Sequence, residues 1–331
     1  MRTQKPIKTA VLLCIYLSIN GLFVAKYSGV STAVPWLTVL GYLLLAGLAL
    51  GIPLRYSSWS WLRRSPRLLT STLLAVSALG LFLLMRQYDP SQIASGRYPA
   101  IVDWLSRLFA GQFPYTVSTE PSGFPFLFVL ASPFYWLGDV GLLQIGAFVA
   151  FGIVIVRAAG DNHGHAGLML LALLASPAFL YEVVVRSELF SNMVALLLYV
   201  HFCRVDRIQK GFQAAVFWGL AAGLLLSTRG TALPVLVLFG GYLLHRAGPA
   251  RTVAWGTGLV AGFWLTLLPF LIWDADAFFS GGPFAIQTSY LPGWTIVLAM
   301  LATVGLAWRV QRRSQAYYLA GVVLFATVAI A

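Results

Sequence analysis

Apolar segments interrupt the chain along its whole length, and this feature constrains the fold more than any single motif. Apolar residues make up 59% of the 331 residues, and charged residues only 10%. A bilayer offers no water to backbone N–H and C=O groups, so apolar segments of this kind are expected to cross it as helices. The sequence therefore predicts an all-α, polytopic transmembrane helical bundle.

Eleven crossings account for the sequence. Several are shorter than the roughly 20 residues that span a bilayer, so we expect their ends to extend into the adjoining loops. The predicted crossings are Thr9 to Ala25, Val34 to Leu54, Leu68 to Met85, Val140 to Arg157, Ala166 to Leu180, Leu189 to Cys203, Phe212 to Ser227, Thr231 to Arg246, Thr252 to Ile272, Pro292 to Arg309 and Ala316 to Ala331.

The distribution of charge predicts the orientation. With the N-terminus inside, the inner face holds 16 of the 22 Lys and Arg residues but only two of the ten acids, Asp161 and Asp206. An excess of Lys and Arg in short loops marks the inner side of a membrane protein. The formal charge of +12 is therefore interpreted as a topology signal rather than as nucleic-acid binding.

The ends of the chain and its two cysteines add little. The N-terminal charged stretch and apolar run resemble a signal peptide, but no small-x-small cleavage site follows, so we expect this segment to be retained. The last apolar run ends at Ala331, which predicts a very short outer tail or a sequence that ends early. Cys14 and Cys203 provide neither a disulfide framework nor a cysteine-rich metal site.

The largest predicted outer loop runs from residue 86 to residue 123 and begins just before Asp89. Within it, apolar residues recur at helical spacing between Pro99 and Ala110, with Asp103 on the opposite side. This pattern predicts an amphipathic helix that lies on the membrane surface. The following apolar segment, Phe124 to Leu137, is short and contains two prolines, so we expect a re-entrant or interfacial segment on the outer side.

Three further outer clusters carry ionisable or polar groups. The first contains Glu182, Arg186 and Glu188, and the second is Arg229 at a helix junction. The third runs from Trp273 to Pro292 and contains Asp274, Asp276, Gln287 and Tyr290. Ionisable groups at membrane depth are costly, so they are functional-site candidates. We expect the loops to converge on one face.

The chemistry available at this face follows from its residue types. All four histidines fall at or near the inner surface, so acid–base catalysis on the outer face would depend mainly on carboxylates. Arg186 and Arg229 suit an anionic group such as phosphate, because guanidinium stays charged and offers several donors in one plane. A carboxylate base beside phosphate-holding arginines is what a lipid-phosphate-sugar transferase needs.

The chain resembles the GT-C glycosyltransferases. The resemblance rests on Asp89 at the start of a large outer loop, the amphipathic helix, the stretch Gly111 to Tyr115, and the proline-rich re-entry EPSGFPF. The later SPAFLYEVVVRSELFSN resembles a segment of bacterial membrane mannosyltransferases. The resemblance implies a hexosyltransferase, with mannose as the favoured sugar, that takes its sugar from a polyprenyl phosphate, with Asp89 as base and inversion at the anomeric carbon.

The resemblance covers roughly Leu68 to Pro292 of a single integral membrane domain, residues 1–331. Residues 1–67 then form two added N-terminal spans, and residues 293–331 form C-terminal spans. Many GT-C members carry two adjacent acids in the first outer loop, whereas Pro90 follows Asp89 here. This departure favours a lipid monophosphate donor over metal-assisted donor binding.

Each assignment has a structural alternative. Asp89 could cap its helix, Glu182 and Arg186 could pair at i, i+4, and Arg229 could extend toward lipid headgroups. Further possible site acids are Glu120, Glu188, Asp103 and Glu182. No cofactor is expected; a divalent metal is not indicated, and His163 with His165 is a weak signal for one.

The expected partners are the donor, a glycan or lipid acceptor and membrane lipids, with a partner subunit left open. A lipid or glycan transporter or flippase, and a non-catalytic membrane assembly subunit, are the alternative functions. Few charges lie within predicted spans, and no matching interrupted helices point to a transporter with inverted repeats.

Overall fold

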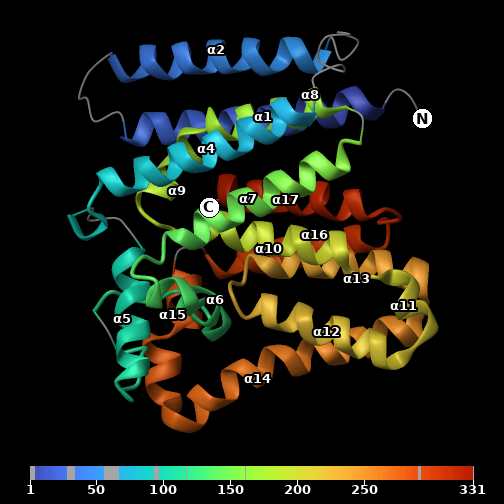
Figure 1. The fold of residues 1–331 in the computed structure, drawn as a ribbon. Helices are drawn as coiled ribbons and strands as arrows, with labels where there is room; N and C mark the ends of the chain where they lie inside the picture. The colour runs from blue at the N-terminus through green and yellow to red at the C-terminus, as the bar shows by residue number, and fades with distance from the viewer. Residues whose placement is uncertain are drawn as a thin grey trace. The chain divides into compact units, whose positions relative to one another are not determined.

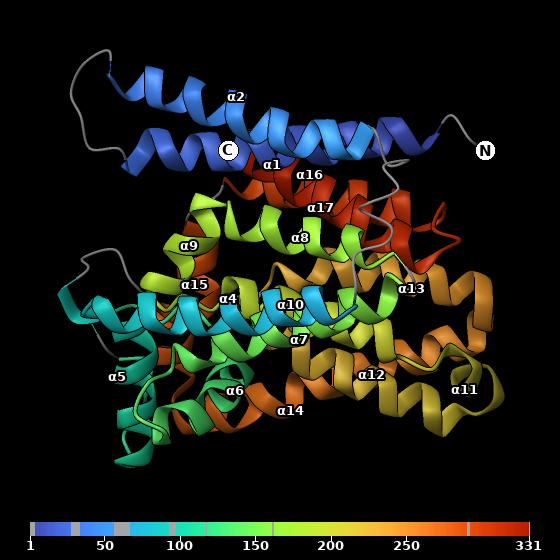
Figure 2. The same ribbon diagram turned by 45° about the horizontal axis from the view of Figure 1, so that its top comes forward.

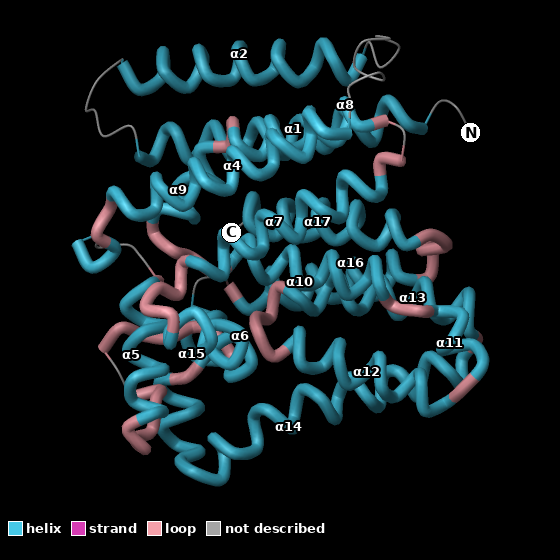
Figure 3. Tube along the Cα trace, viewed as in Figure 1, coloured by secondary structure: helices cyan, strands magenta, loops and turns pink. Residues whose placement is uncertain are grey.

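The computed structural model describes residues 4–27, 34–55, 67–92, 97–116, 118–160, 162–289 and 292–330. Asp161, Tyr290 and Ala331 lie outside the described residues. Within the described part the chain is helical, with no strands (Figure 3). The chain forms two compact units, Met1–Asp89 with Gln144–Val185, and Pro90–Leu143 with Arg186–Ala331, called unit 1 and unit 2 below.

Unit 1 holds the N-terminal helices and a later stretch of chain. The helix α1 packs along α2 in both views (Figures 1 and 2). Asn20 of α1 fixes the break that follows α8: its Oδ1 accepts hydrogen bonds from Ser176 Oγ (2.6 Å) and from the backbone N–H of Ala178 (3.1 Å). The helices of unit 1 are α1 (Gln4–Tyr27), α2 (Val34–Arg55), α4 (Arg67–Gln87), most of α7 (Leu142–Ala158), α8 (His163–Leu174) and α9 (Pro177–Val184).

Unit 2 is built from longer helices with short helices at both ends. In Figure 1, α5, α6 and α15 gather at one end of the long helices, and α11 lies at the other end. The elements of unit 2 are η1 (Pro90–Gln92), α5 (Tyr98–Phe109), α6 (Pro125–Trp136), α10 (Leu189–Phe202), α11 (Val205–Lys210), α12 (Phe212–Leu226), α13 (Ala232–Ala247), α14 (Pro249–Gly281), α15 (Pro283–Ser289), α16 (Gly293–Ala307) and α17 (Arg313–Ile330).

The predicted crossings fall on helices, one of them broken at Ala175 and Ser176. Among the described residues, three helical stretches are long and apolar enough to cross a membrane: Ile7–Tyr27, Arg67–Gln87 and Pro249–Ser289. A fourth is formed if α8 and α9, which meet at 65°, make one broken span. These helices indicate an integral membrane protein.

The predicted amphipathic helix is confirmed as α5, but the environment of its apolar face differs from the expectation. Ile101, Trp104 and Leu105 are buried in a core shared with α6 and α14. The Trp104 ring stacks on Phe128 of α6, with 4.0 Å between centroids and 7° between planes. The expectation that this face rests on lipid is therefore wrong for these three residues, because protein already covers them.

The segment after the predicted crossing Thr252 to Ile272 is helical, where a loop was expected. The chain leaves helical geometry at Asp274 (φ −158°, ψ 92°) and continues as helix to Gly281. Asp274 Oδ1 accepts a hydrogen bond from the backbone N–H of Ala277 (2.9 Å), which is the contact of a helix N-cap. A second helical piece and α15 therefore occupy a stretch that the sequence analysis assigned to a loop.

Glycines bring α12 and α14 into backbone contact. A Cβ built at Gly223 would meet the carbonyl oxygen of Leu259 and the backbone of Gly262 and Phe263. Gly256 of α14, in contrast, has open space around its Cβ position. The close packing therefore depends on the glycines that face the partner helix.

We predict that Gly223→Ala and Gly256→Ala change stability in opposite directions. The first places a methyl group against backbone that has no rotamer to change, and overpacking of this kind costs about 1–3 kcal/mol. The second replaces a helical glycine without steric conflict and is expected to stabilise by about 0.5–1 kcal/mol. The measurement is the midpoint temperature at which detergent-solubilised protein loses its monodisperse size-exclusion peak; equal midpoints for both variants would contradict the packing argument.

Candidate functional site

A buried carboxylate joins two arginines from distant parts of unit 2. Glu188 precedes α10, Arg229 precedes α13 by a short turn, and Arg97 precedes α5. Glu188 Oε1 accepts hydrogen bonds from Arg97 Nη1 (3.0 Å) and Arg229 Nε (2.9 Å), and Arg229 Nη2 also contacts this oxygen. The side chains of Glu188 and Arg229 are 2% and 8% exposed, whereas that of Arg97 is 37% exposed. We call these three residues the arginine cluster.

The arginine cluster carries an excess of positive charge when Glu188 is ionised, because two guanidinium groups share one carboxylate. Burial raises the pKa of the Glu188 carboxyl, and the positive charge of Arg97 opposes that rise. Each arginine has more donors than Glu188 can accept, since guanidinium has five N–H groups. The cluster is therefore suited to an additional anion.

Two polar side chains connect the arginine cluster to other loops. Arg229 Nη2 donates to Ser122 Oγ (2.9 Å). Gln287 of α15 donates from Nε2 to the carbonyl oxygen of Ser122 (2.6 Å) and accepts at Oε1 from the backbone N–H of Gly230 (3.0 Å). The predicted convergence of the loops around Ser122, Glu188, Arg229 and Gln287 is thus confirmed within unit 2.

Arg186 forms a separate ion pair, with Asp139. Its Nε donates to both carboxylate oxygens of Asp139, at 3.0 and 3.2 Å, and its guanidinium carbon lies 5.4 Å from the centroid of the Tyr98 ring. Arg186 has a left-handed backbone (φ 53°), which is uncommon for a residue with a side chain. Asp139 neutralises this arginine, whereas the arginine cluster retains excess charge.

The other candidate acids occupy different surroundings. Asp89 is exposed, two residues after the end of α4, and is the last residue of the first segment of unit 1. Glu182 lies in α9 of the same unit. Asp103 is half-buried on the polar side of α5. Glu120 belongs to unit 2, is exposed, and has a left-handed backbone with φ 49°.

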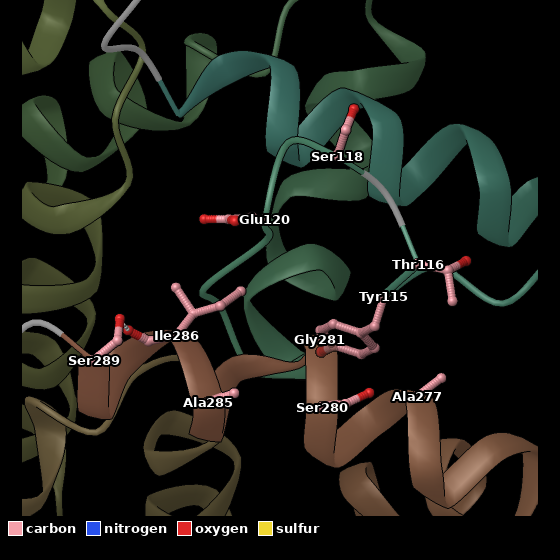
Figure 4. A pocket seen from close by; sticks show the side chains of 10 residues that line it. All are labelled: Tyr115, Thr116, Ser118, Glu120, Ala277, Ser280, Gly281, Ala285, Ile286 and Ser289. Carbon is pink, nitrogen blue, oxygen red and sulfur yellow. Dashed lines mark hydrogen bonds between the residues drawn. The ribbon is translucent and has the colours of Figure 1, made fainter.

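Two cavities border α15 on different sides. One, of about 490 Å³, is seen in Figure 4 and has Glu120 above Ile286 and Ser289 of α15. The other, of about 270 Å³, is mainly apolar and is lined by residues that include Gly230, Phe284 and Gln287. The turn that carries Arg229 and Gly230 therefore adjoins an apolar cavity.

The described residues contain no group of three His, Cys, Asp or Glu side chains that could hold a metal ion. Comparison of the chain with protein-family models, with curated proteins and with solved structures found no match. The candidate site is therefore defined by its geometry alone.

Sequence reasoning missed Arg97, Ser122 and Asp139. Arg97 stands before a predicted amphipathic helix, and Asp139 lies between two apolar runs, so their positions at element ends were weak signals. Ser122 has no distinguishing pattern around it. Each of the three is far along the chain from its partner: Arg97 is 91 residues from Glu188, Ser122 is 107 residues from Arg229, and Asp139 is 47 residues from Arg186.

We predict that Glu188→Gln destabilises the protein more than Arg229→Met. Loss of one partner from a buried ion pair costs about 3–5 kcal/mol, because the remaining charge is left uncompensated. Glu188→Gln removes the carboxylate from both arginines, whereas in Arg229→Met the carboxylate keeps Arg97. The measurement is the thermal midpoint in detergent. The double variant should lower the midpoint by less than the sum of the decreases in the two single variants; strictly additive decreases would contradict the coupling between Glu188 and Arg229.

Proposed function

We propose that this protein is a membrane glycosyltransferase of the GT-C type. It would move a hexose, with mannose as the first choice, from a polyprenyl phosphate carrier to a glycan or lipid acceptor on the outer face of a bacterial-type inner membrane. In this topology the N-terminus is inside and eleven segments cross the bilayer.

The observation that carries the proposal is the excess positive charge of the arginine cluster. Guanidinium groups bind phosphate oxygens through several N–H donors at once, and a partly buried site strengthens that interaction. Arg97 and Arg229 share one carboxylate, so the cluster suits a singly or doubly charged phosphate. Arg186, already compensated by Asp139, is the weaker of the two phosphate ligands expected from the sequence.

The apolar cavity beside Gly230 supports a lipid-linked donor in particular. Its lining includes Leu233 and Pro234 of α13, Ile296 of α16 and Leu324 of α17. A prenyl chain would enter such a cavity from the apolar interior of the bilayer, so packing against these side chains, rather than removal from water, would hold it. A phosphate on Arg229 with its chain in this cavity would use both features at once.

The proposed reaction is a single displacement. Asp89 takes the proton from the acceptor hydroxyl while that oxygen attacks the anomeric carbon of the donor sugar. The bond between the anomeric carbon and the phosphate oxygen breaks, and the departing lipid phosphate is stabilised by Arg229 and Arg97, with Arg186 as the further candidate ligand. The configuration at the anomeric carbon inverts.

The first test is release of polyprenyl phosphate from a panel of labelled polyprenyl-phosphate sugars, with a crude membrane extract as the source of acceptor. Asp89→Asn is expected to lower turnover at least about a hundredfold, the usual scale for the loss of a general base. Asp206→Asn makes the same chemical change at an exposed acid in α11 and serves as the control. Equal turnover by wild type and Asp89→Asn would contradict the role of Asp89 as the base. If wild type turned over none of the donors in the panel, the transferase proposal itself would be contradicted.

The role of the arginine cluster has its own test. Arg97 is the most exposed member, and in Arg97→Gln the Glu188 carboxylate keeps Arg229, so we expect this variant to fold. We predict that this variant raises KM for the polyprenyl-phosphate sugar about tenfold, because a charge-assisted hydrogen bond to the donor is lost. The control is Arg204→Gln, at the opposite end of α10. An unchanged KM would contradict phosphate binding at the cluster.

A further inference from the structure

The cavity of about 490 Å³ is a second feature of unit 2 that the proposed phosphate site leaves unused. Its volume is in the range of cavities that hold small molecules. Its walls come from the loop that follows α5, from the second helical piece of α14, and from α15 (Figure 4). The lining residues are Tyr115, Thr116, Ser118, Glu120, Ala277, Ser280, Gly281, Ala285, Ile286 and Ser289.

The polar groups of this cavity mainly accept hydrogen bonds. Ser280 donates its hydroxyl hydrogen to the carbonyl oxygen of Asp276 (2.7 Å), and Ser289 donates to that of Ile286 (2.8 Å). Thr116 donates to Phe113 O (3.1 Å) and accepts from Arg107 Nη1 (2.9 Å). An ionised Glu120 has acceptors only. The lining therefore suits a ligand that supplies many donors, and it disfavours a phosphate.

Glu120 is held in an unfavourable backbone conformation at the mouth of this cavity. Its φ of 49° is adopted readily by glycine but rarely by glutamate. Two residues later, Ser122 is fixed by Arg229 and Gln287, so the surrounding contacts maintain the conformation. Residues held in this way are concentrated at ligand sites, where the conformation places a side chain for binding.

We propose that this cavity binds a neutral carbohydrate and that Glu120 accepts hydrogen bonds from its hydroxyl groups. Sugar hydroxyls supply the donors that the lining lacks, while Ala277, Ala285 and Ile286 offer apolar surface to the C–H face of a sugar ring. In the transferase this ligand is the glycan acceptor, and that part of the inference rests on the proposed function. The binding site itself depends on the cavity alone.

The test is direct binding of neutral oligosaccharides to the purified full chain in detergent, measured by saturation-transfer NMR. Glu120→Gln removes the charge, and Ala277→Phe fills the cavity without changing Glu120. Each is expected to raise the dissociation constant at least about tenfold. Ala275→Phe makes the same change at an exposed alanine of α14 that does not line the cavity, and binding should be unchanged.

A third variant separates binding from folding. Glu120→Gly relieves the left-handed backbone, so we expect its thermal midpoint to equal or exceed that of wild type while carbohydrate binding is lost. Absence of binding by any neutral oligosaccharide at millimolar concentration, or equal binding by all variants, would overturn the proposal. Binding of amino sugars without any binding of neutral sugars would contradict the assignment of a neutral carbohydrate as the ligand.

These outcomes are independent of turnover. Carbohydrate binding that depends on Glu120, in a protein that releases no polyprenyl phosphate, would support the cavity and contradict the transferase. Turnover by wild type with an unchanged acceptor KM in Glu120→Gln would support the transferase and contradict the assignment of this cavity to the acceptor.

Discussion

The Glu188 carboxylate is the interaction on which the candidate site depends. A buried charge is tolerated only when it is paired, and Glu188 is paired with Arg97 and Arg229 through a single oxygen. Arg229 in turn holds Ser122, and Ser122 holds Gln287, so four loops meet through one chain of hydrogen bonds. The segment before Ser122, which carries Glu120, is thereby anchored beside α15. The charge that remains in excess is available for an anion.

The short helix α15 gives the site two different chemical surroundings. Successive residues of a helix point in directions about 100° apart, so seven residues suffice to present two faces. Pro283, Phe284, Gln287 and Thr288 line the apolar cavity, whereas Ala285, Ile286 and Ser289 line the cavity that contains Glu120. Under the proposed function, one face would contact the lipid chain and the other the glycan. The separation explains how a small membrane protein could hold both kinds of substrate.

Much of the secondary structure could be predicted because hydropathy and helical periodicity are local properties of the sequence. The predicted crossings fall on helices, and α5 lies where its 3.6-residue pattern placed it. The same pattern was misleading about what covers that helix, because Trp104 looks alike in sequence whether it faces lipid or Phe128. Asp274 was assigned to a loop, yet its side chain caps a further helical piece. A polar residue after a helix can either begin a loop or cap the N-terminus of a further helix, and the conformation of the residues that follow decides which.

The sequence by itself determined that this chain belongs to the helical membrane proteins, and it identified Glu188 and Arg229 as ionisable groups at membrane depth and therefore as candidate site residues. Both conclusions follow from the cost of placing polar groups in an apolar medium, which depends on residue type. Only the tertiary structure decided which partner each charge has: Asp139 for Arg186, and a shared Glu188 for Arg97 and Arg229. Partner choice is a property of distances between atoms, and residues far apart along the chain acquire such distances only when the helices pack.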